Sequence, residues 1–149
     1  MPTLAENKKA YFNYEVLEKF EAGVILNGQE VKSLKTNGVN LAGSYVVLKN
    51  EKVFWIGANI PPYQPRNIGS SYNPERSREI LLKKSEIKYL VGKTKQKGLT
   101  LVPLKVYTIR GKIKLEFAIV KGKRKFDKRE TIKKKDVERE LDRELKERG

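Results

Sequence analysis

The last 29 residues of this 149-residue chain constrain its fold more than any other feature, because 21 of them are charged. A segment with so few apolar side chains cannot bury enough surface to offset the entropy that it loses on folding alone. Residues 1–120 must therefore supply the folded body, and their number suits a single domain. We expect a domain over residues 1–120 and a basic tail over residues 121–149.

Positive charge is in excess in both parts. Residues 1–120 hold 20 basic and 10 acidic side chains, and residues 121–149 hold 13 and 8, so the net charge is +15. Such a surplus favours an anionic partner, either a nucleic acid or a membrane surface. No apolar run approaches the roughly 18 residues of a membrane span, and the start shows no signal pattern. We expect a cytoplasmic protein, with the Lys and Glu content typical of thermophiles.

The chain has no cysteine and no histidine, and this absence excludes several kinds of site. Disulfides, thiolate zinc sites and nucleophiles that depend on Cys or His are ruled out. A carboxylate-only magnesium site, and with it a nuclease, stays open. Its candidates are Glu15, Glu18 and Glu21, but strand alternation separates Glu15 from Glu18, and Glu21 better suits a surface hydrogen-bond acceptor. As a catalytic signal this pattern is weak, and we expect no cofactor.

Apolar and polar residues alternate along most of the body, which is typical of half-buried β-strands. One long strand is predicted from Phe12 through Leu26, with a bulge near Leu17–Lys19 where the alternation changes phase. Two hairpins are predicted after it, Tyr45–Leu48 with Val53–Ile56 and Val102–Ile109 with Ile113–Ile119 across the turn Arg110-Gly111. About five or six strands with an inserted helix indicate a mainly β fold, a small closed antiparallel barrel with three short helices.

Capping residues mark the three helices. The first runs from the N-cap Asn27, with Glu30 in capping-box position, to Gly38. The second begins at Asn73-Pro74, with proline in the first helical position. The third runs from Ser85 to Gly98 and presents one apolar face, made of Ile87, Leu90 and Val91. A loop over about residues 60–73 is long enough to be a candidate functional or mobile segment.

Basic residues gather in three places, namely Lys32 with Lys35, residues 83–97 and residues 121–135. Together they favour phosphate binding over a merely solubilising surface. Phe126 lies within the basic run of the tail, where it either stacks on a base or docks on the rim of the barrel.

Further along the tail, Asp127 and Glu130 have capping-box spacing. Val137, Leu141 and Leu145 then form a narrow apolar stripe on a charged helix, which gains little by packing on its own barrel. We expect a tail that is disordered when free and helical when bound.

Several groups of residues follow one another in the order found in the SsrA-binding protein family, the small protein B of bacteria. They are Phe20-Glu21-Ala22-Gly23, Gly28 to Lys35, Asn40-Leu41 with Ser44-Tyr45, Pro74-x-Arg76-x-Arg78 with Leu81-Leu82, Gly98 to Leu104, and Gly122-Lys123 with Asp127-Lys128-Arg129. The chain resembles this family from Asn7 into the tail. The resemblance implies an OB-fold-like barrel, without catalytic activity or metal, that binds transfer-messenger RNA and delivers it to stalled ribosomes. It also implies the ribosome and elongation factor Tu as partners, and we expect a monomer.

The resemblance also implies which residues contact each partner. The barrel face that holds the tRNA-like part of the RNA would contain Asn7, Glu21, Leu81 and Lys83, and Lys35 stands where the family usually has an arginine. We add the basic residues Lys8 and Lys32 to this face. The part of the tail that enters the small-subunit decoding region would contain Lys121, Lys123, Arg124, Lys125, Phe126, Asp127, Lys128 and Arg129.

Composition alone leaves one alternative, a barrel that binds single-stranded nucleic acid without sequence preference. Such a barrel exposes several aromatic side chains on one face of its sheet, which an inspection of the fold can test.

Overall fold

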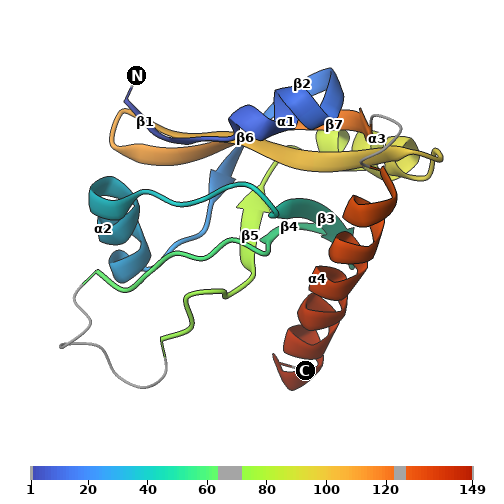
Figure 1. Ribbon diagram of the computed structural model, residues 1–149. Helices are drawn as coiled ribbons and strands as arrows, with labels where there is room; N and C mark the ends of the chain where they lie inside the picture. The colour runs from blue at the N-terminus through green and yellow to red at the C-terminus, as the bar shows by residue number, and fades with distance from the viewer. Residues whose placement is uncertain (1, 64–71, 123–126, 149) are drawn as a thin grey trace.

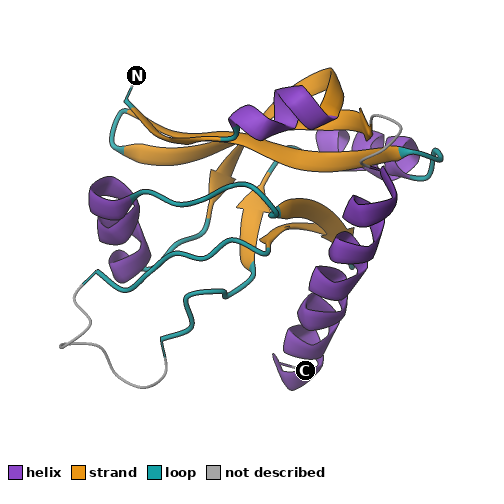
Figure 2. Ribbon diagram, in the orientation of Figure 1, coloured by secondary structure: helices purple, strands orange, loops and turns teal. Residues whose placement is uncertain are grey.

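The computed structural model describes residues 2–63, 72–122 and 127–148, and for residues 127–133 and 148 it describes the backbone alone. The elements are Thr3–Glu6 (β1), Lys8–Asn13 (α1), Tyr14–Val24 (β2), Gly28–Asn37 (α2), Tyr45–Lys49 (β3), Lys52–Ile56 (β4), Arg78–Leu81 (β5), Lys84–Thr94 (α3), Leu99–Ile109 (β6), Lys112–Gly122 (β7) and Asp127–Arg148 (α4). The mainly β fold with helices is confirmed (Figure 2).

Seven antiparallel strands of the described chain form one sheet in the order β1-β6-β3-β4-β5-β2-β7, and β6 also pairs with β7 (Figure 1). The pairings of β2 to β7 therefore run in a circuit, with β1 attached outside it along β6. The stretch of paired residues is long between β7 and its neighbours β2 and β6. Between β3 and β6 the pairing is limited to Val46 with Leu101. This arrangement is the barrel that the strand pattern predicted.

The predicted bulge lies in β2, where the register against β7 shifts between Val16 and Glu18. The start of this strand was predicted wrongly, because Phe12 belongs to α1 and is 78% exposed. Asn7 begins that helix by accepting a hydrogen bond from the Ala10 backbone N–H through its side chain (3.2 Å). Phe12 lies in α1 and Tyr14 begins β2, so the apparent alternation crossed the boundary between a helix and a strand.

Both predicted hairpins are confirmed, and each closes through a two-residue turn. Asn50 and Glu51 have φ of 52° and 62°, and Arg110 and Gly111 have φ of 51° and 79°. Positive φ at both central residues is the type I′ geometry that fits the twist of paired strands.

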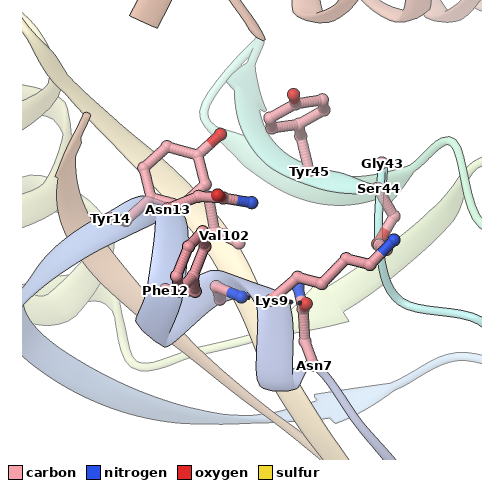
Figure 3. Close-up of a pocket in the computed structure, with 11 residues that line it drawn as sticks. Asn7, Lys9, Phe12, Asn13, Tyr14, Gly43, Ser44, Tyr45 and Val102 are labelled. Carbon is pink, nitrogen blue, oxygen red and sulfur yellow. Dashed lines mark hydrogen bonds between the residues drawn. The ribbon is translucent and has the colours of Figure 1, made fainter. Parts of the chain in front are cut away.

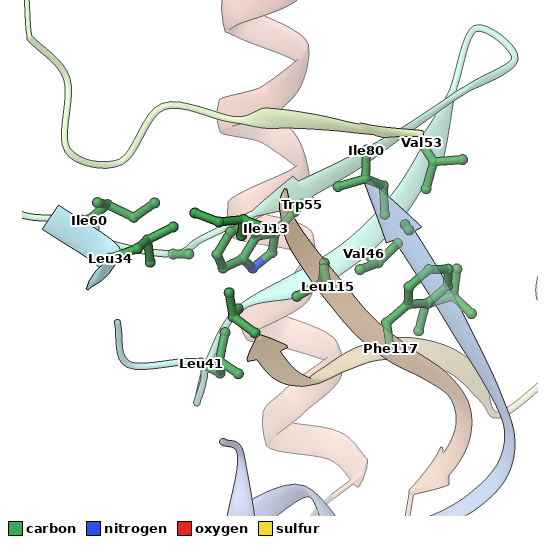
Figure 4. Close-up of a cluster of buried hydrophobic side chains, with 14 of the residues drawn as sticks. Leu34, Leu41, Val46, Val53, Trp55, Ile60, Ile80, Ile113, Leu115 and Phe117 are labelled. Atoms are coloured by element: carbon green, nitrogen blue, oxygen red, sulfur yellow. The ribbon is translucent and has the colours of Figure 1, made fainter. Parts of the chain in front are cut away.

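The barrel interior holds one of two apolar clusters. Trp55 is fully buried at its centre among side chains from the sheet and α2, including Leu34, Leu115 and Phe117 (Figure 4). The Trp55 indole N–H donates to the Ser44 hydroxyl (3.2 Å), so the one polar atom of this ring is satisfied.

The second cluster lies on the outside of β3, β4, β6 and β7. Along β3 the side chains of Tyr45 and Val47 belong to this outer cluster, whereas Val46 belongs to the interior. Strands buried on both faces have almost unbroken apolar runs, which β3 and β4 show. Helices α1 and α4 cover the outer face through Ala10 and Leu141, so this cluster ties both helices to the barrel.

Helix α2 agrees with its prediction. Asn27 accepts from the Glu30 N–H (2.9 Å), the Glu30 carboxylate accepts from the Asn27 N–H (3.0 Å), and Gly38 follows the last turn with φ of 70°. Helix α3 is also present, but it ends at Thr94 before Gly98, and Val91 is 38% exposed and does not face the core.

The helix predicted at Asn73-Pro74 is wrong. The Asn73 side chain accepts from the Glu75 N–H (3.0 Å), and the Pro74 carbonyl accepts from the Ile60 N–H (2.9 Å) and from Arg78 (2.9 Å). These bonds form a turn that leads directly into β5. Of the predicted long loop, residues 64–71 lie outside the described residues.

Candidate nucleic-acid interface

The seven residues assigned to the RNA-binding face of the barrel fall in three places. Asn7 and Lys8 lie at the start of α1, Lys32 and Lys35 lie on α2, and the remaining three, Glu21, Leu81 and Lys83, lie on β2, at the end of β5 and just before α3. Figure 1 places α2 on the opposite side of the molecule from α3. One compact contact therefore cannot include all of them.

Glu21 and Leu81 come together on the outer face of the sheet. Leu81 pairs with Gly23, two residues after Glu21 on the same face of β2, and it is 54% exposed. A Cβ at Gly23 would lie 3.8 Å from the Leu81 Cβ and 3.9 Å from the Lys114 Nζ. Because glycine has no side chain, the surface between Leu81 and Lys114 stays open at this position. We call Glu21, Gly23, Leu81 and Lys114 the β2–β5 patch.

Charges extend from the β2–β5 patch across the neighbouring strands. Glu21 lies opposite Glu116 of β7, which in turn lies opposite Lys105 of β6, and the Lys105 Nζ is 4.0 Å from the Glu116 carboxylate. The Tyr107 hydroxyl donates a hydrogen bond to the Glu21 carboxylate. Burial, together with that hydrogen bond, raises the pKa of Tyr107, so the phenol stays protonated and holds Glu21 in place.

The sequence analysis did not assign Lys114 or Tyr107 to this surface. The alternation of β7 already places Lys114 outward, so the signal was present. Tyr107 lies in an apolar strand and is 3% exposed, and only the pairing of β6 with β7 shows that its hydroxyl reaches a residue of β2.

Asn7 has a positioning role in the fold. It is 6% exposed, its amide donates to the Pro103 carbonyl of β6 (3.0 Å), and its oxygen caps α1. Both polar ends of the side chain are thus used inside the protein. Lys8, the next residue, is exposed.

Lys83 is exposed directly before α3, where its backbone N–H donates to the Glu86 carboxylate (3.2 Å). Lys32 and Lys35 are exposed on α2, and the Lys32 Nζ lies 5.8 Å from the centre of the Tyr63 ring. All three ammonium groups are therefore accessible to phosphates.

A buried ion-pair network fixes α2 beside β5. The Glu30 carboxylate is completely buried and accepts from Arg76 (2.5 Å) and Arg78 (2.6 Å). Burial would raise the pKa of Glu30, but the hydrogen bonds from Arg76 and the Asn27 backbone and the charge of Arg78 outweigh it, so the pKa lies below its usual value. Arg78 also donates to the carbonyls of Ala58 (2.8 Å) and Pro74. The network therefore joins the two ends of the segment between β4 and β5.

The tail begins after β7, where Lys121 is exposed. Lys123, Arg124, Lys125 and Phe126 lie outside the described residues. Asp127, Lys128 and Arg129 form the first turn of α4, but their side chains, and with them the predicted capping box of Asp127 and Glu130, also lie outside.

The later part of α4 packs on the barrel, and the expectation that its apolar stripe gains little there is wrong. Leu141 is completely buried in the outer cluster, and Val137 and Leu145 pack beside it. A Cβ at Gly57, whose φ is 78°, would lie 3.0 Å from the Val137 Cγ1, so the helix approaches the end of β4 closely. The sequence could not show this face, because it is assembled from four strands.

Polar contacts flank the apolar stripe. The Glu144 carboxylate accepts from the Ser77 N–H (3.2 Å) and hydroxyl (3.1 Å), and Asp142 lies 3.4 Å from the Lys49 Nζ. These contacts fix how α4 is rotated against the barrel.

The three glutamates considered for a metal site do not converge. Glu18 accepts from the Tyr89 hydroxyl (2.7 Å), whereas Glu21 is bonded to Tyr107. Within residues 2–63, 72–122 and 127–148, no group of three or more carboxylates is placed to hold a metal ion. None of the helices in these ranges is long and apolar enough to cross a membrane.

Known proteins resemble the chain over almost its whole length. It is 47% identical over 147 residues to the SsrA-binding protein of Thermosipho africanus, and this match covers 98% of both chains. It is 49% identical over 145 residues to the SsrA-binding protein of Syntrophobacter fumaroxidans, and this match covers 97% of this chain and 89% of the relative. A solved structure described as "tmRNA-SmpB: a journey to the center of the bacterial ribosome" has a TM-score of 0.67 at 37% identity, covering 88% of this chain and 95% of the other. The SmpB protein family matches residues 4–147. The chain therefore belongs to the SmpB family.

Proposed function

We propose that the protein is an RNA-binding adaptor, which holds the tRNA-like part of transfer-messenger RNA and delivers it to stalled ribosomes for trans-translation. The observation that carries this proposal is the family match over residues 4–147, which includes both the barrel and the basic tail. The net charge of +15 supports it, because an RNA supplies the neutralising phosphates.

On the barrel, we assign the RNA contact to the β2–β5 patch together with Lys83. An exposed leucine beside a fixed carboxylate and a nearby lysine suits RNA, since Leu81 offers an apolar surface, Glu21 an acceptor for a 2′-hydroxyl or base donor, and Lys114 a cation for phosphate. Lys8 is assigned to the same face, with Asn7 holding its helix in position. Lys32 and Lys35 contact a separate part of the RNA, because they lie on α2.

In the tail, we assign Lys121, Lys123, Arg124, Lys125, Phe126, Asp127, Lys128 and Arg129 to the small-subunit decoding region of the ribosome. Helix α4 of the tail is docked on the barrel in the structure, which contradicts the expected disorder of the free tail, so the proposal does not require this helix to fold on the ribosome. The proposal also includes elongation factor Tu as a partner in delivery, a monomeric protein in the cytoplasm, and no catalytic role.

The test is a pull-down of the full chain from a bacterial lysate, followed by sequencing of the retained RNA. We expect one structured species with a tRNA-like end, and tRNA-like competitors that displace it better than poly-U. Equal competition by poly-U would favour the single-stranded binder instead.

The fold gives no support to that alternative. The exposed large aromatics of the described residues are Tyr11, Phe12 and Tyr89, and they lie on α1 and α3 rather than on one face of the sheet. A barrel that binds single strands along its sheet needs several such rings in a row.

A further inference from the structure

Helix α3 carries a row of lysines on its outer surface that the proposed RNA contact does not include. The other side of the helix packs on the barrel, where Leu90 is completely buried. Lys84, Lys88 and Lys95 follow one another at spacings of four and seven residues, so they share one face, and all three are exposed. Gly92 lies on the same face, one turn after Lys88. We call Lys84, Lys88, Gly92 and Lys95 the α3 lysine face.

The stability of the helix does not account for these lysines. Lys84 and Lys88 are four residues apart, where like charges repel each other on a helix surface. Lys84 is also the first residue of α3, where a cation opposes the positive end of the helix dipole. In the part of the chain that the structure describes, no ion pair involves a lysine of this face. Three cations gathered against their own repulsion indicate an anionic partner.

Gly92 is a second, independent sign of a partner. Glycine weakens the interior of a helix, so its presence there needs a reason. Gly43 has such a reason, because it adopts φ of 83° in a turn at the edge of a cavity of about 440 Å³ (Figure 3). Gly92 lies within α3, and no heavy atom of the described residues lies within 4 Å of the place where its Cβ would be. The missing side chain therefore leaves room for a molecule that approaches the α3 lysine face closely.

The length of the α3 lysine face indicates the kind of anion. Lys84 and Lys95 are separated by about 16 Å along the helix, a distance that covers several phosphates of one nucleic-acid strand rather than one small anion. Between them, Gly92 lets a sugar–phosphate backbone lie directly against the helix. The face is also continuous with the proposed RNA contact, because Lys84 follows Lys83 in the chain.

We propose that the α3 lysine face binds the sugar–phosphate backbone of the same RNA that the β2–β5 patch holds. Lys84, Lys88 and Lys95 each contact a phosphate, and Gly92 admits the backbone between them. The inference rests on the proposed function in taking that RNA as the occupant.

The first test compares RNA binding in variants of the full chain. The probe is a fluorescein-labelled transcript of the tRNA-like part of transfer-messenger RNA, titrated by anisotropy at several salt concentrations. Lys84→Ala combined with Lys88→Ala should make the slope of log K against log salt shallower by roughly two units. The matched control is Lys135→Ala combined with Lys146→Ala, which removes the same charge from exposed positions of α4 and should leave the slope near that of the wild type.

Gly92→Gln tests the close approach. Glutamine forms helices better than glycine, so the thermal midpoint should rise by about 1–3 °C. The new side chain would fill the space between the lysines, and the affinity should fall by about 5- to 150-fold, as overpacking of a closely fitted contact does. Gly92→Ala should lower the affinity less. A gain in stability together with a loss of binding is a result that a purely structural role of Gly92 cannot give.

Lysine acetylation followed by mass spectrometry provides a test without substitutions. Saturating RNA should protect the three lysines of the α3 lysine face, whereas the two control lysines of α4 should stay reactive. Unchanged acetylation, equal losses in the α3 and α4 variants, or normal binding by the α3 variants while Leu81→Ala weakens it would overturn the inference and leave the proposed function standing. A loss seen only with purified small ribosomal subunits as the probe would also overturn it. Absence of any RNA binding by the wild type would overturn both.

Discussion

The docking of α4 on the barrel predicts a specific response to the loss of one side chain. Leu141 is completely buried between α4 and the outer cluster, so Leu141→Ala removes the centre of that contact and leaves a cavity. Leucine-to-alanine changes at buried sites cost about 2–5 kcal/mol. Because α4 lies on the surface and can settle onto the barrel, we expect the lower part of this range, about 2–3 kcal/mol. The ratio of docked to undocked helix should therefore fall about 30- to 150-fold.

Amide hydrogen exchange measures this ratio directly, because an undocked helix with so charged a sequence does not stay folded. The amides of α4 in Leu141→Ala should exchange faster by the same factor, whereas those of β6 and β7 should keep their protection. The matched control is Arg143→Ala on the exposed face of the helix, where Arg143 forms a surface ion pair with Glu140 (3.3 Å). Equal exchange in the two variants would refute the docking, and equal acceleration in α4 and the barrel would show that they unfold as one unit.

Three further predictions concern the ion-pair network and the two basic surfaces. Glu30→Gln leaves Arg78 buried without its counter-charge and should lower the free energy of unfolding in urea by about 3–5 kcal/mol. Because the pKa of Glu30 is lowered in the folded state, the difference from the wild type should be complete above the ordinary pKa of 4.5 and should shrink as the pH falls through the folded pKa. Lys32→Ala and Lys35→Ala should each weaken RNA binding and make the slope of log K against log salt shallower by roughly one unit; unchanged slopes would remove α2 from the interface. Substitution of residues 127–129 by alanine should leave RNA binding near normal but abolish the rescue of stalled ribosomes in a reconstituted translation assay; full rescue would show that the tail is assigned wrongly.

The strands could be predicted well from the sequence because their signals are local. Alternation along β7, the change of phase near Leu17 and the two-residue turn at Arg110 depend on neighbouring residues only. The cap of α2 is local as well, since Asn27 and Glu30 are three residues apart. Each of these elements would keep its signal if the rest of the chain were unknown.

The failures occurred where distant residues decide the structure. Asn73-Pro74 has the pattern of a helix start, but Arg78 is held by Glu30, 48 residues away, and the chain continues as a strand. Helix α1 is fixed by the bond from Asn7 to Pro103, 96 residues away. In the candidate site, Leu81 and Lys83 were assigned from the family resemblance alone. The bond between Tyr107 and Glu21 could not be predicted, because it requires the register of three strands.

The docked position of α4 also limits how the tail can act on a partner. After residue 132 the apolar residues of the chain are Val137, Leu141 and Leu145, and all three pack on the outer cluster. A helix with one apolar stripe cannot present it to the barrel and to a second surface at once. A partner that binds this stripe must therefore first displace α4, and the free energy of docking is subtracted from the affinity that the contact would otherwise give. The docking contacts described for α4 run from Val137 to Leu145, so this cost applies to a partner that binds that part of the helix.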